Sequence, residues 1–284
     1  MYADFYGLRA LPFQLTPDSR LFYPSQMHRG ALAYLTYGLR KSEGFVLITG
    51  DVGTGKTMLV DYLLSVIDAA RYLTSKIVTT QIEPEDLIRM VASGFGLDPA
   101  RHQKSTVIRQ LETLFVEARR RKLSPLIIVD EVHNLPRASL EELRMISNYR
   151  RADAPLVQTI LLGQTQFREA LANGALEQVK QRVVASSHLR PLSANETRGY
   201  IEHRLRAVGW AEDPVIASDV FALVYEETLG IPRRINTVFD RLMLVGYVEE
   251  RHDIGANLLE TVMRELRLEG LFGEPARAQR GSRG

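Results

Sequence analysis

The chain has 284 residues, of which 45% are hydrophobic and 25% are charged, as expected for a soluble globular protein with one large domain or two modest ones. Its net charge of +2 gives no global electrostatic reason to expect binding to nucleic acid or to an anionic membrane. Because cysteine is absent, disulfides and thiolate-ligated metal sites are excluded. The chain has neither a secretory signal nor eighteen uninterrupted apolar residues, so we expect a cytoplasmic protein without a membrane span.

The first 43 residues place prolines between aromatic residues before a helical pattern begins. Pro12, Pro17 and Pro24 separate the aromatic residues, and apolar residues then recur at helical spacing from Ala31 to Leu39. We therefore expect residues 1–43 to form an irregular, packed N-terminal arm that leads into a first helix.

Residues 50–57 carry the clearest motif of the chain, between the apolar run 45–48 and a helix-like segment. They fit G-x-x-x-x-G-K-[ST], whose glycines let backbone N–H groups surround phosphate oxygens. Lys56 would place a positive charge near the β- and γ-phosphates, and the Thr57 hydroxyl would ligate Mg²⁺. We expect a nucleoside triphosphate site formed by Gly50, Asp51, Val52, Gly53, Thr54, Gly55, Lys56, Thr57 and Met58.

Strand-like and helix-like segments alternate from this loop to about residue 190. The strand-like segments span residues 77–80, 126–129, 156–162 and 183–185, and helical patterns lie between them. The continuous apolar run 126–129 is typical of a strand that is buried on both faces. The alternation predicts an α/β domain over residues 44–190, with a parallel sheet covered by helices on both faces.

From residue 191 the strand pattern stops and only helical patterns follow. Ser193 and Glu196 form a capping box that opens a helix, and Gly230 is expected to end the helix over residues 218–229. Two further helices are expected after Pro232. We therefore predict a small all-helical lid domain over residues 191–268, followed by a disordered tail over residues 269–284.

Two carboxylates, Asp130 and Glu131, follow the buried run 126–129 at the expected carboxyl edge of the sheet, where open α/β folds bind ligands. Asp130 would hold Mg²⁺, largely through water, and Glu131 would orient or deprotonate an attacking water. The alternative is an ordinary exposed acidic strand end. His133 completes the string Asp-Glu-Val-His, which occurs in helicases, but a second helicase core is absent. We therefore interpret His133 as a residue at the start of a helix.

Gln164 and Arg182 stand where they would complete such a site. Gln164 follows the next strand and would reach between Glu131 and the γ-phosphate, or else hydrogen-bond within its own turn. Arg182 lies too far along the fold to reach its own nucleotide easily. If subunits assemble head to tail, Arg182 would act on the γ-phosphate of a neighbour. Lys180 and Arg190 are the competing residues for this role, and a surface salt bridge is the other alternative.

Arg233 and Arg234 lie in the first turn of a predicted helix, where the helix dipole disfavours cations. Two arginines there indicate an anionic partner such as a nucleotide phosphate. We expect Arg233 to make that contact and Arg234 to be its substitute. A surface pair with Asp240 or Glu226 is the alternative.

The order and spacing of these residues resemble the AAA+ ATPases throughout residues 30–265. The resemblance implies binding and hydrolysis of ATP with Mg²⁺, in an oligomer. It also implies Walker A at 50–57, Walker B at 127–131, sensor 1 at Gln164, an arginine finger at Arg182 and sensor 2 at Arg233.

Other segments resemble the secretion ATPase family typified by general secretion pathway protein A, in the branch found with exosortase and PEP-CTERM systems. They include residues 5–8, 12–13 and 16–18 of the arm, and residues 141–148, 161–164 and 230–236. The resemblance implies a homo-oligomeric motor or assembly factor that works with inner-membrane proteins of envelope secretion or polysaccharide export. Met58 departs from the family pattern, which usually has a second threonine there.

Two other functions stay open. A DNA-associated ATPase of the transposition or replication-initiator type shares the same two-domain core, but it would need a basic recognition element. Only Arg277, Arg280 and Arg283, in the expected tail, offer basic residues beyond the lid. A switch that binds ATP and hardly hydrolyses it is disfavoured by the presence of both Glu131 and Arg182.

Overall fold

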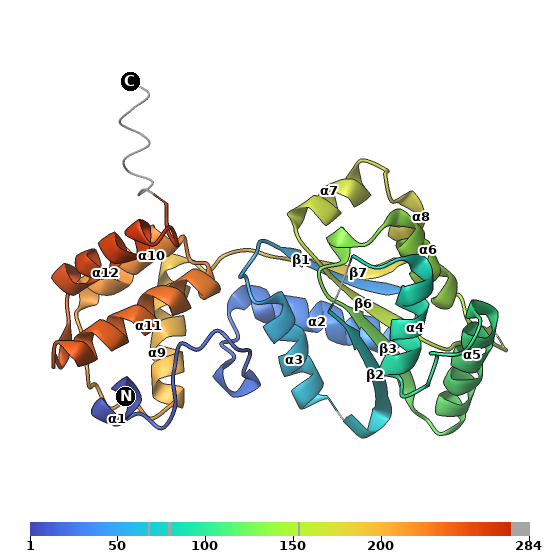
Figure 1. The fold of residues 1–284 in the computed structure, drawn as a ribbon, viewed down its shortest axis with the longest axis horizontal. Coiled ribbons are helices and arrows are strands. Elements are labelled where there is room, and N and C mark those ends of the chain that lie inside the picture. The colour runs from blue at the N-terminus through green and yellow to red at the C-terminus, as the bar shows by residue number, and fades with distance from the viewer. Residues whose placement is uncertain (68, 79–80, 153, 274–284) are drawn as a thin grey trace. The chain divides into compact units, whose positions relative to one another are not determined.

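The computed structural model describes residues 1–67, 69–78, 81–152 and 154–273 (Figure 1). Its internal contacts divide the chain into two compact units. The first, which we call the α/β unit, consists of Gln26–Val52 and Leu59–Leu189. The second, which we call the helical unit, consists of Met1–Ser25, Gly53–Met58 and the residues from Arg190 onward. In the described ranges, no helix combines the length and the apolarity needed to cross a membrane.

The α/β unit is built on a five-stranded parallel sheet with the order β2-β3-β6-β1-β7. Because all neighbouring strands run parallel, their carboxyl ends meet at one edge of the sheet. β1 and β6 are buried at every residue, as expected for inner strands covered on both faces. The predicted fold class is thus confirmed. The strands are β1 (Phe45–Gly50), β2 (Tyr72–Ile77), β3 (Ser124–Val129), β6 (Gln158–Gly163) and β7 (Val183–Leu189).

Alternate residues of the strands face two helical layers. Phe45 and Leu47 of β1 belong to one core with α4 and α5, which includes Leu87 and Leu111. On the other face α2 crosses β1 so closely that a Cβ added to Gly38 would lie 2.2 Å from Cγ2 of Val46. The helices are α2 (Gln26–Lys41), α3 (Lys56–Val66), α4 (Pro84–Gly94), α5 (Lys104–Arg120), α6 (Arg137–Ile146), α7 (Thr165–Ala172) and α8 (Glu177–Lys180), with the 3-10 turns η2 (Ala69–Arg71) and η3 (Val132–Asn134).

One predicted strand is wrong in position. The sequence predicts a strand at residues 77–80, of which 79–80 lie outside the described residues, whereas β2 ends at Ile77. β2 is an edge strand with only one neighbour, β3, and along its last four residues the exposed Thr74 and Lys76 alternate with the buried Ser75 and Ile77. Because Thr74, Ser75 and Lys76 are polar, β2 contains no apolar run from which it could be predicted.

Two other strands differ from the prediction at their ends. β6 begins at Gln158 rather than at residue 156, because the buried Gln158 amide donates to the Gly38 carbonyl at 2.5 Å and lets a polar residue open the strand. β7 continues to Leu189, and its His188 ring contacts the Thr49 hydroxyl at 3.0 Å. A short hairpin that the sequence does not predict precedes β6, formed by β4 (Arg150–Arg151) and β5 (Ala154–Pro155).

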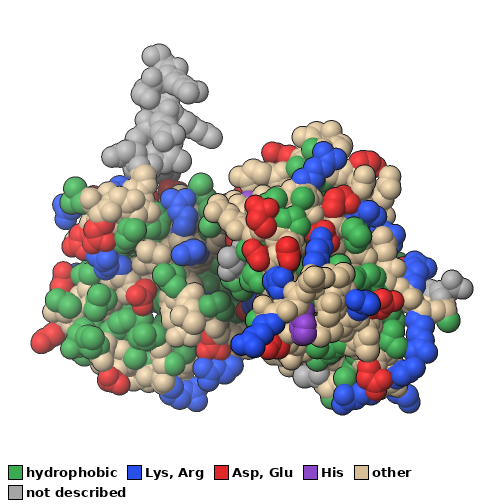
Figure 2. Space-filling model, turned by 45° about the vertical axis from the view of Figure 1, so that its right-hand side comes forward, with side chains coloured by type: hydrophobic (Ala, Val, Ile, Leu, Met, Phe, Trp, Pro, Cys, Tyr) green, Lys and Arg blue, Asp and Glu red, His purple; other side chains and the backbone are tan. Residues whose placement is uncertain are grey.

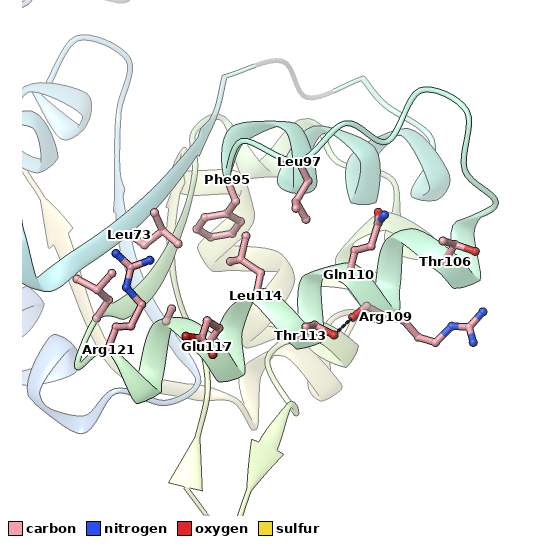
Figure 3. A pocket seen from close by; sticks show the side chains of 12 residues that line it. Leu73, Phe95, Leu97, Thr106, Arg109, Gln110, Thr113, Leu114, Glu117 and Arg121 are labelled. Atoms are coloured by element: carbon pink, nitrogen blue, oxygen red, sulfur yellow. Dashed lines mark hydrogen bonds between the residues drawn. The ribbon is translucent and has the colours of Figure 1, made fainter.

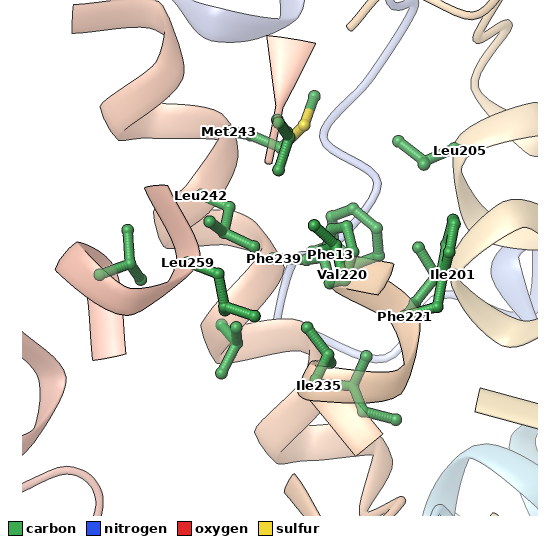
Figure 4. Packing of buried hydrophobic residues seen from close by; sticks show 14 of the residues in the cluster. Phe13, Ile201, Leu205, Val220, Phe221, Ile235, Phe239, Leu242, Met243 and Leu259 are labelled. Carbon is green, nitrogen blue, oxygen red and sulfur yellow. The ribbon is translucent and has the colours of Figure 1, made fainter. Parts of the chain in front are cut away.

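The helical unit packs its helices around a second apolar core, shown in Figure 4. Phe13 of the arm is 1% exposed and lies with its ring 5.0 Å from that of Phe239. The elements of this unit are α1 (Tyr2–Phe5), η1 (Ser19–Leu21), α9 (Ala194–Ala207), α10 (Ser218–Thr228), α11 (Pro232–Val248) and α12 (Ala256–Leu268), with a short parallel pair, β8 (Val215–Ile216) and β9 (Asp253–Ile254).

Polar contacts also hold the arm in the helical unit. The Tyr2 hydroxyl donates to Oδ1 of Asp240 at 2.6 Å. The Arg204 guanidinium, in a residue only 2% exposed, donates to the carbonyls of Pro12 at 2.5 Å and Gln14 at 3.4 Å. A buried charge needs such partners, so Arg204 ties the arm to α9.

The predicted helix ends of this unit are confirmed at the start of α9 and corrected elsewhere. Ser193 and Glu196 form the capping box. The left-handed cap of α10 is Leu229, with φ of 53°, and Gly230 follows it with φ of 69°. The predicted tail starts packed, because Phe272 is 7% exposed and lies 4.8 Å from the Arg234 guanidinium. Residues 274–284 of that tail lie outside the described residues.

Candidate functional site

The phosphate loop connects β1 to α3, as its motif requires. Gly53 has φ of 81° and Gly55 has φ of 92°, a backbone conformation that favours glycine. Lys56 begins α3, so the N-terminal end of a helix follows the loop directly. Thr54 is 1% exposed and Lys56 is 6% exposed. The loop thus has the backbone geometry that turns N–H groups toward an anion.

The acidic pair follows β3 at the carboxyl edge of the sheet. Asp130 is 4% exposed, and its amide continues the pairing of β3 by donating to the Ile77 carbonyl at 2.9 Å. The Glu131 amide donates to Oδ1 of Asp130 at 2.8 Å. Glu131 itself has φ of 51° and ψ of 37°, a left-handed conformation that is costly for a residue with a side chain. The chain therefore turns sharply between the two carboxylates and leaves the Glu131 side chain 40% exposed.

Gln164 follows β6 and lies next to Glu131. Its Nε2 donates to Oε2 of Glu131 at 3.1 Å. β6 and β3 are neighbours in the sheet, which places the residue after each strand at the same edge. The side chain thus bonds outside its own turn, to the residue that the sequence prediction names.

His133 is a member of this group that sequence reasoning misses. Its Nε2 lies 3.3 Å from Oε2 of Glu131, and its Nδ1 accepts a hydrogen bond of 3.4 Å from the Gln164 amide. It lies in η3, so its interpretation as a residue at the start of a helix describes its position but not its contacts. The short spacing Asp-Glu-Val-His is the signal that could have found it.

Thr165 and Asp51 form a second contact that the sequence does not indicate. The Thr165 hydroxyl donates to Oδ1 of Asp51 at 2.7 Å. Asp51 directly follows β1, and Thr165 begins α7. The contact therefore ties the first variable residue of the phosphate loop to the helix that follows Gln164.

Arg182 lies at the opposite edge of the sheet. Its carbonyl accepts from the Phe45 amide at 2.8 Å, so it stands at the amino end of β1. β1 has six residues, and at about 3.3 Å per residue its two ends are roughly 16 Å apart. The α/β unit therefore does not bring Arg182 to Gly50, Glu131 or Gln164.

Arg233 and Arg234 differ in their surroundings within the helical unit. The Arg233 amide donates to the Gly53 carbonyl at 3.3 Å, and its side chain is exposed. Arg234 lies over the Phe272 ring. Asp240, one of the expected surface partners, accepts from Tyr2. These contacts favour Arg233 over Arg234 as the arginine that is free to meet a ligand.

The residues present fit a nucleotide with Mg²⁺. Thr57 offers a hydroxyl oxygen in the first turn of α3, and Asp130 offers a carboxylate at the carboxyl edge of the sheet. Such hard oxygen donors are the ligands that Mg²⁺ prefers. The left-handed glycines and the buried Lys56 supply the complementary donors for phosphate.

A cavity of about 750 Å³ in the α/β unit is separate from this group. Phe95 and Leu97 point toward Leu114 of α5 across it (Figure 3). It is also lined by Leu73, near the start of β2, and by Leu123, just before β3. The cavity therefore lies toward the amino end of the strands, away from Asp130 and Glu131.

In a comparison with protein families, residues 39–171 match the AAA domain family. The fold is that of an AAA P-loop NTPase. The matched range contains β1, β3, β6 and the residues that group around Glu131.

General secretion pathway protein A of Aeromonas hydrophila is 31% identical to this chain over 258 residues. The match covers 89% of this chain and 46% of that protein, so the chain spans about half the length of its relative. The chain is thus similar to one part of a secretion protein, over both of its units.

Solved structures with the same fold include ORC and RuvB proteins. ORC1 of Aeropyrum pernix, in complex with DNA, superposes with a TM-score of 0.69 at 18% identity, over 91% of this chain and 70% of that chain. ORC2 of the same organism, with ADPNP and ADP, gives 0.68 at 15% identity, over 89% and 71%. RuvB of Thermotoga maritima gives 0.56 at 17% identity, over 86% and 70%. At these identities the similarity establishes the fold alone.

Proposed function

We propose that this protein hydrolyses ATP with Mg²⁺ as an oligomeric AAA ATPase and uses the turnover to drive an envelope secretion or polysaccharide export assembly. The observation that carries the proposal is the hydrogen bond of 3.1 Å between Gln164 and Glu131 at the carboxyl edge of the sheet. This bond links two groups with different proposed roles. The Glu131 carboxylate would accept a proton from water, and the Gln164 side-chain amide would donate to the γ-phosphate.

In this proposal the phosphate loop binds the triphosphate through the amides of residues 50–58, with Lys56 beside the β- and γ-phosphates. Thr57 and Asp130 hold Mg²⁺, which when bound neutralises charge on the phosphates. Glu131 orients the attacking water and accepts its proton. Gln164 holds the Glu131 carboxylate and donates toward the γ-phosphate, and Arg233 contacts the nucleotide from the lid.

Arg182 acts in trans in this proposal. The distance of roughly 16 Å between the two edges of the sheet separates Arg182 from the phosphate loop of its own α/β unit. A head-to-tail assembly would bring that edge of one subunit to the loop of the next, where a guanidinium stabilises the charge of phosphoryl transfer.

The envelope role rests on the similarity to general secretion pathway protein A of Aeromonas hydrophila and on the resemblance to the exosortase-associated branch. We propose that the protein works in the cytoplasm and contacts the inner membrane through a protein partner. Genes for exosortase or polysaccharide export beside this one would support the pathway, and transposase genes would contradict it.

Four variants test hydrolysis. Lys56→Ala should abolish ATP binding, and Glu131→Gln should bind ATP with turnover reduced at least about a hundredfold. Arg182→Ala should lose ATP turnover when it is assayed alone. Arg120→Ala serves as its control, because it changes an exposed arginine at the end of α5, just before β3 and therefore at the same edge of the sheet. Mixing Glu131→Gln with Arg182→Ala should restore part of the turnover. Failure to recover turnover at any mixing ratio would contradict the shared site.

The DNA-associated alternative is tested by filter binding over a salt series, since phosphate contacts give a steep negative slope. On the face seen in Figure 2, positive and negative side chains are interspersed, and such a surface does not favour the binding of duplex DNA. Arg277, Arg280 and Arg283 lie outside the described residues. Tight, salt-sensitive DNA binding would replace the envelope role but not the ATPase chemistry.

A further inference from the structure

We propose that His133 is a positioning residue for Glu131: its neutral ring donates from Nε2 to Oε2 of the carboxylate and so fixes which oxygen is left to act on water. The inference rests on the proposed function, in which Glu131 accepts a proton. His133 touches Glu131 and Gln164, and we assign it no contact with the nucleotide.

The two ring nitrogens of His133 have different partners, and this determines where the proton lies. The Gln164 amide can only donate, and it points to Nδ1 at 3.4 Å, so Nδ1 must be the acceptor. A neutral imidazole carries its single proton on the other nitrogen. Nε2 therefore carries the proton, and it faces Oε2 of Glu131 at 3.3 Å.

Both donors meet the same oxygen of the carboxylate. Gln164 Nε2 lies 3.1 Å and His133 Nε2 lies 3.3 Å from Oε2 of Glu131. Within the described ranges, no hydrogen bond is recorded to Oε1. One oxygen is thus anchored by two side chains, and the other keeps its lone pairs for a water molecule.

The orientation of the Glu131 side chain depends on its contacts with other side chains, because burial restricts it only in part. Glu131 sits in a left-handed conformation, and its side chain is 40% exposed, so several rotamers are open to it. The His133 side chain is only 13% exposed and follows Val132, which is fully buried. The more buried ring can therefore hold the more exposed carboxylate in one orientation.

The same ring connects the two loops that carry the catalytic candidates. Its Nε2 contacts the residue after β3, and its Nδ1 contacts the residue after β6. A displacement of either loop would break one of the two bonds. His133 therefore fixes Glu131 and the Gln164 backbone together.

The first test is kinetic. His133→Phe keeps a ring of similar size but loses both bonds, whereas His133→Gln keeps a donor near the position of Nε2. We expect His133→Phe to lower kcat by about 10- to 100-fold, because misplaced catalytic groups cost rates of that order. KM and the Kd for ATP should change less than about twofold, and His133→Gln should recover part of kcat. His102→Gln, at an exposed position, is the control.

The second test needs no turnover. Long-range proton–nitrogen NMR of the nucleotide-free protein, with ¹⁵N-labelled histidine, should show His133 as the tautomer protonated at Nε2, assigned by its loss in His133→Phe. Glu131→Ala should shift its Nε2 resonance and leave the other five histidines unchanged. A proton on Nδ1, or no shift in Glu131→Ala, would overturn the inference.

The outcomes separate the two proposals. Wild-type kcat in His133→Phe, or a fall in kcat matched by an equal rise in the Kd for ATP, overturns the positioning role and leaves the ATPase standing. If the wild-type protein binds ATP but does not hydrolyse it, both the proposed function and this inference are contradicted.

Discussion

Thr165 donates its hydroxyl to Oδ1 of Asp51 at 2.7 Å, which ties a carboxylate of the phosphate loop to the first residue of α7. Asp51 is exposed and lies in a segment that we propose binds a polyanion. The hydrogen bond therefore fixes the position of the Asp51 carboxylate, whose negative charge would repel a bound triphosphate.

Asp51→Asn keeps an oxygen for Thr165 and removes this charge. Near an exposed site the repulsion from a triphosphate is on the order of 1 kcal/mol, so we expect about fivefold tighter ATP binding, with a smaller gain at high salt. Calorimetric titration at low and high salt measures it. Thr165→Val removes the bond but not the charge and should not tighten binding. Weaker binding by Asp51→Asn would contradict the repulsion.

Arg204→Met should destabilise the helical unit by about 3 kcal/mol, because it leaves the buried Pro12 carbonyl without its donor and leaves the Gln14 carbonyl with Asn236 alone. Urea unfolding measures this loss, and limited proteolysis should show cleavage within residues 1–25. Arg206→Met removes only an exposed pair with Glu202 on the same helix and should change stability by less than about 0.5 kcal/mol. Equal stability of the two variants would contradict the role of Arg204.

Gly230→Ala should cost more than its matched control, Gly270→Ala. Both glycines have positive φ, 69° and 73°, so both substitutions carry a conformational cost of about 1 kcal/mol. Only at Gly230 would the new Cβ meet an atom, the Leu192 carbonyl oxygen at 2.0 Å, while Gly270 has nothing within 4 Å. We expect a larger loss of melting temperature for Gly230→Ala, and equal losses would show that the backbone relaxes freely there.

His203 should make the helical unit sensitive to mild acid. Burial lowers the pKa of His203 below its ordinary value of 6.5, against the opposing effect of a backbone hydrogen bond with Phe22. The unfolded chain therefore binds the proton more readily, so this stability is complete above pH 6.5 and is lost as the pH falls below it. The unfolding free energy should fall more steeply between about pH 7 and about pH 5 in the wild type than in His203→Gln. Parallel pH curves would contradict this.

The inner strands of the sheet could be predicted because their sequence pattern is easily recognised. β1 and β3 are short apolar runs, and residues buried on both faces leave no other pattern. β2 could not be found this way, since Thr74 and Lys76 are exposed on this edge strand and the buried Ser75 hydroxyl donates to the Val91 carbonyl at 3.1 Å. The packing of Phe272 was equally hidden, because a single aromatic residue in a polar tail has no periodicity.

The candidate site could be predicted wherever one residue follows one strand. Asp130, Glu131 and Gln164 are placed by the ends of β3 and β6, so strand prediction suffices to bring them to one edge. Strand prediction does not place His133 beside Glu131 or Thr165 beside Asp51. These contacts depend on the directions of the His133 and Thr165 side chains, which η3 and α7 set. The spacing Asp-Glu-Val-His brings His133 close to Glu131 along the chain but does not encode the direction of its ring, and no spacing links Thr165 to Asp51.

The packing of the arm with α9 to α12 sets an order for folding during synthesis. Tyr2, Tyr6 and Phe13 are synthesised long before Leu258 and Val262, with which they share a core. The α/β unit has all of its strands by Leu189 and can fold in the interval. Residues 1–25 must therefore wait, with their aromatic side chains uncovered, until α12 has been made. During this interval these side chains are exposed to aggregation or to capture by chaperones.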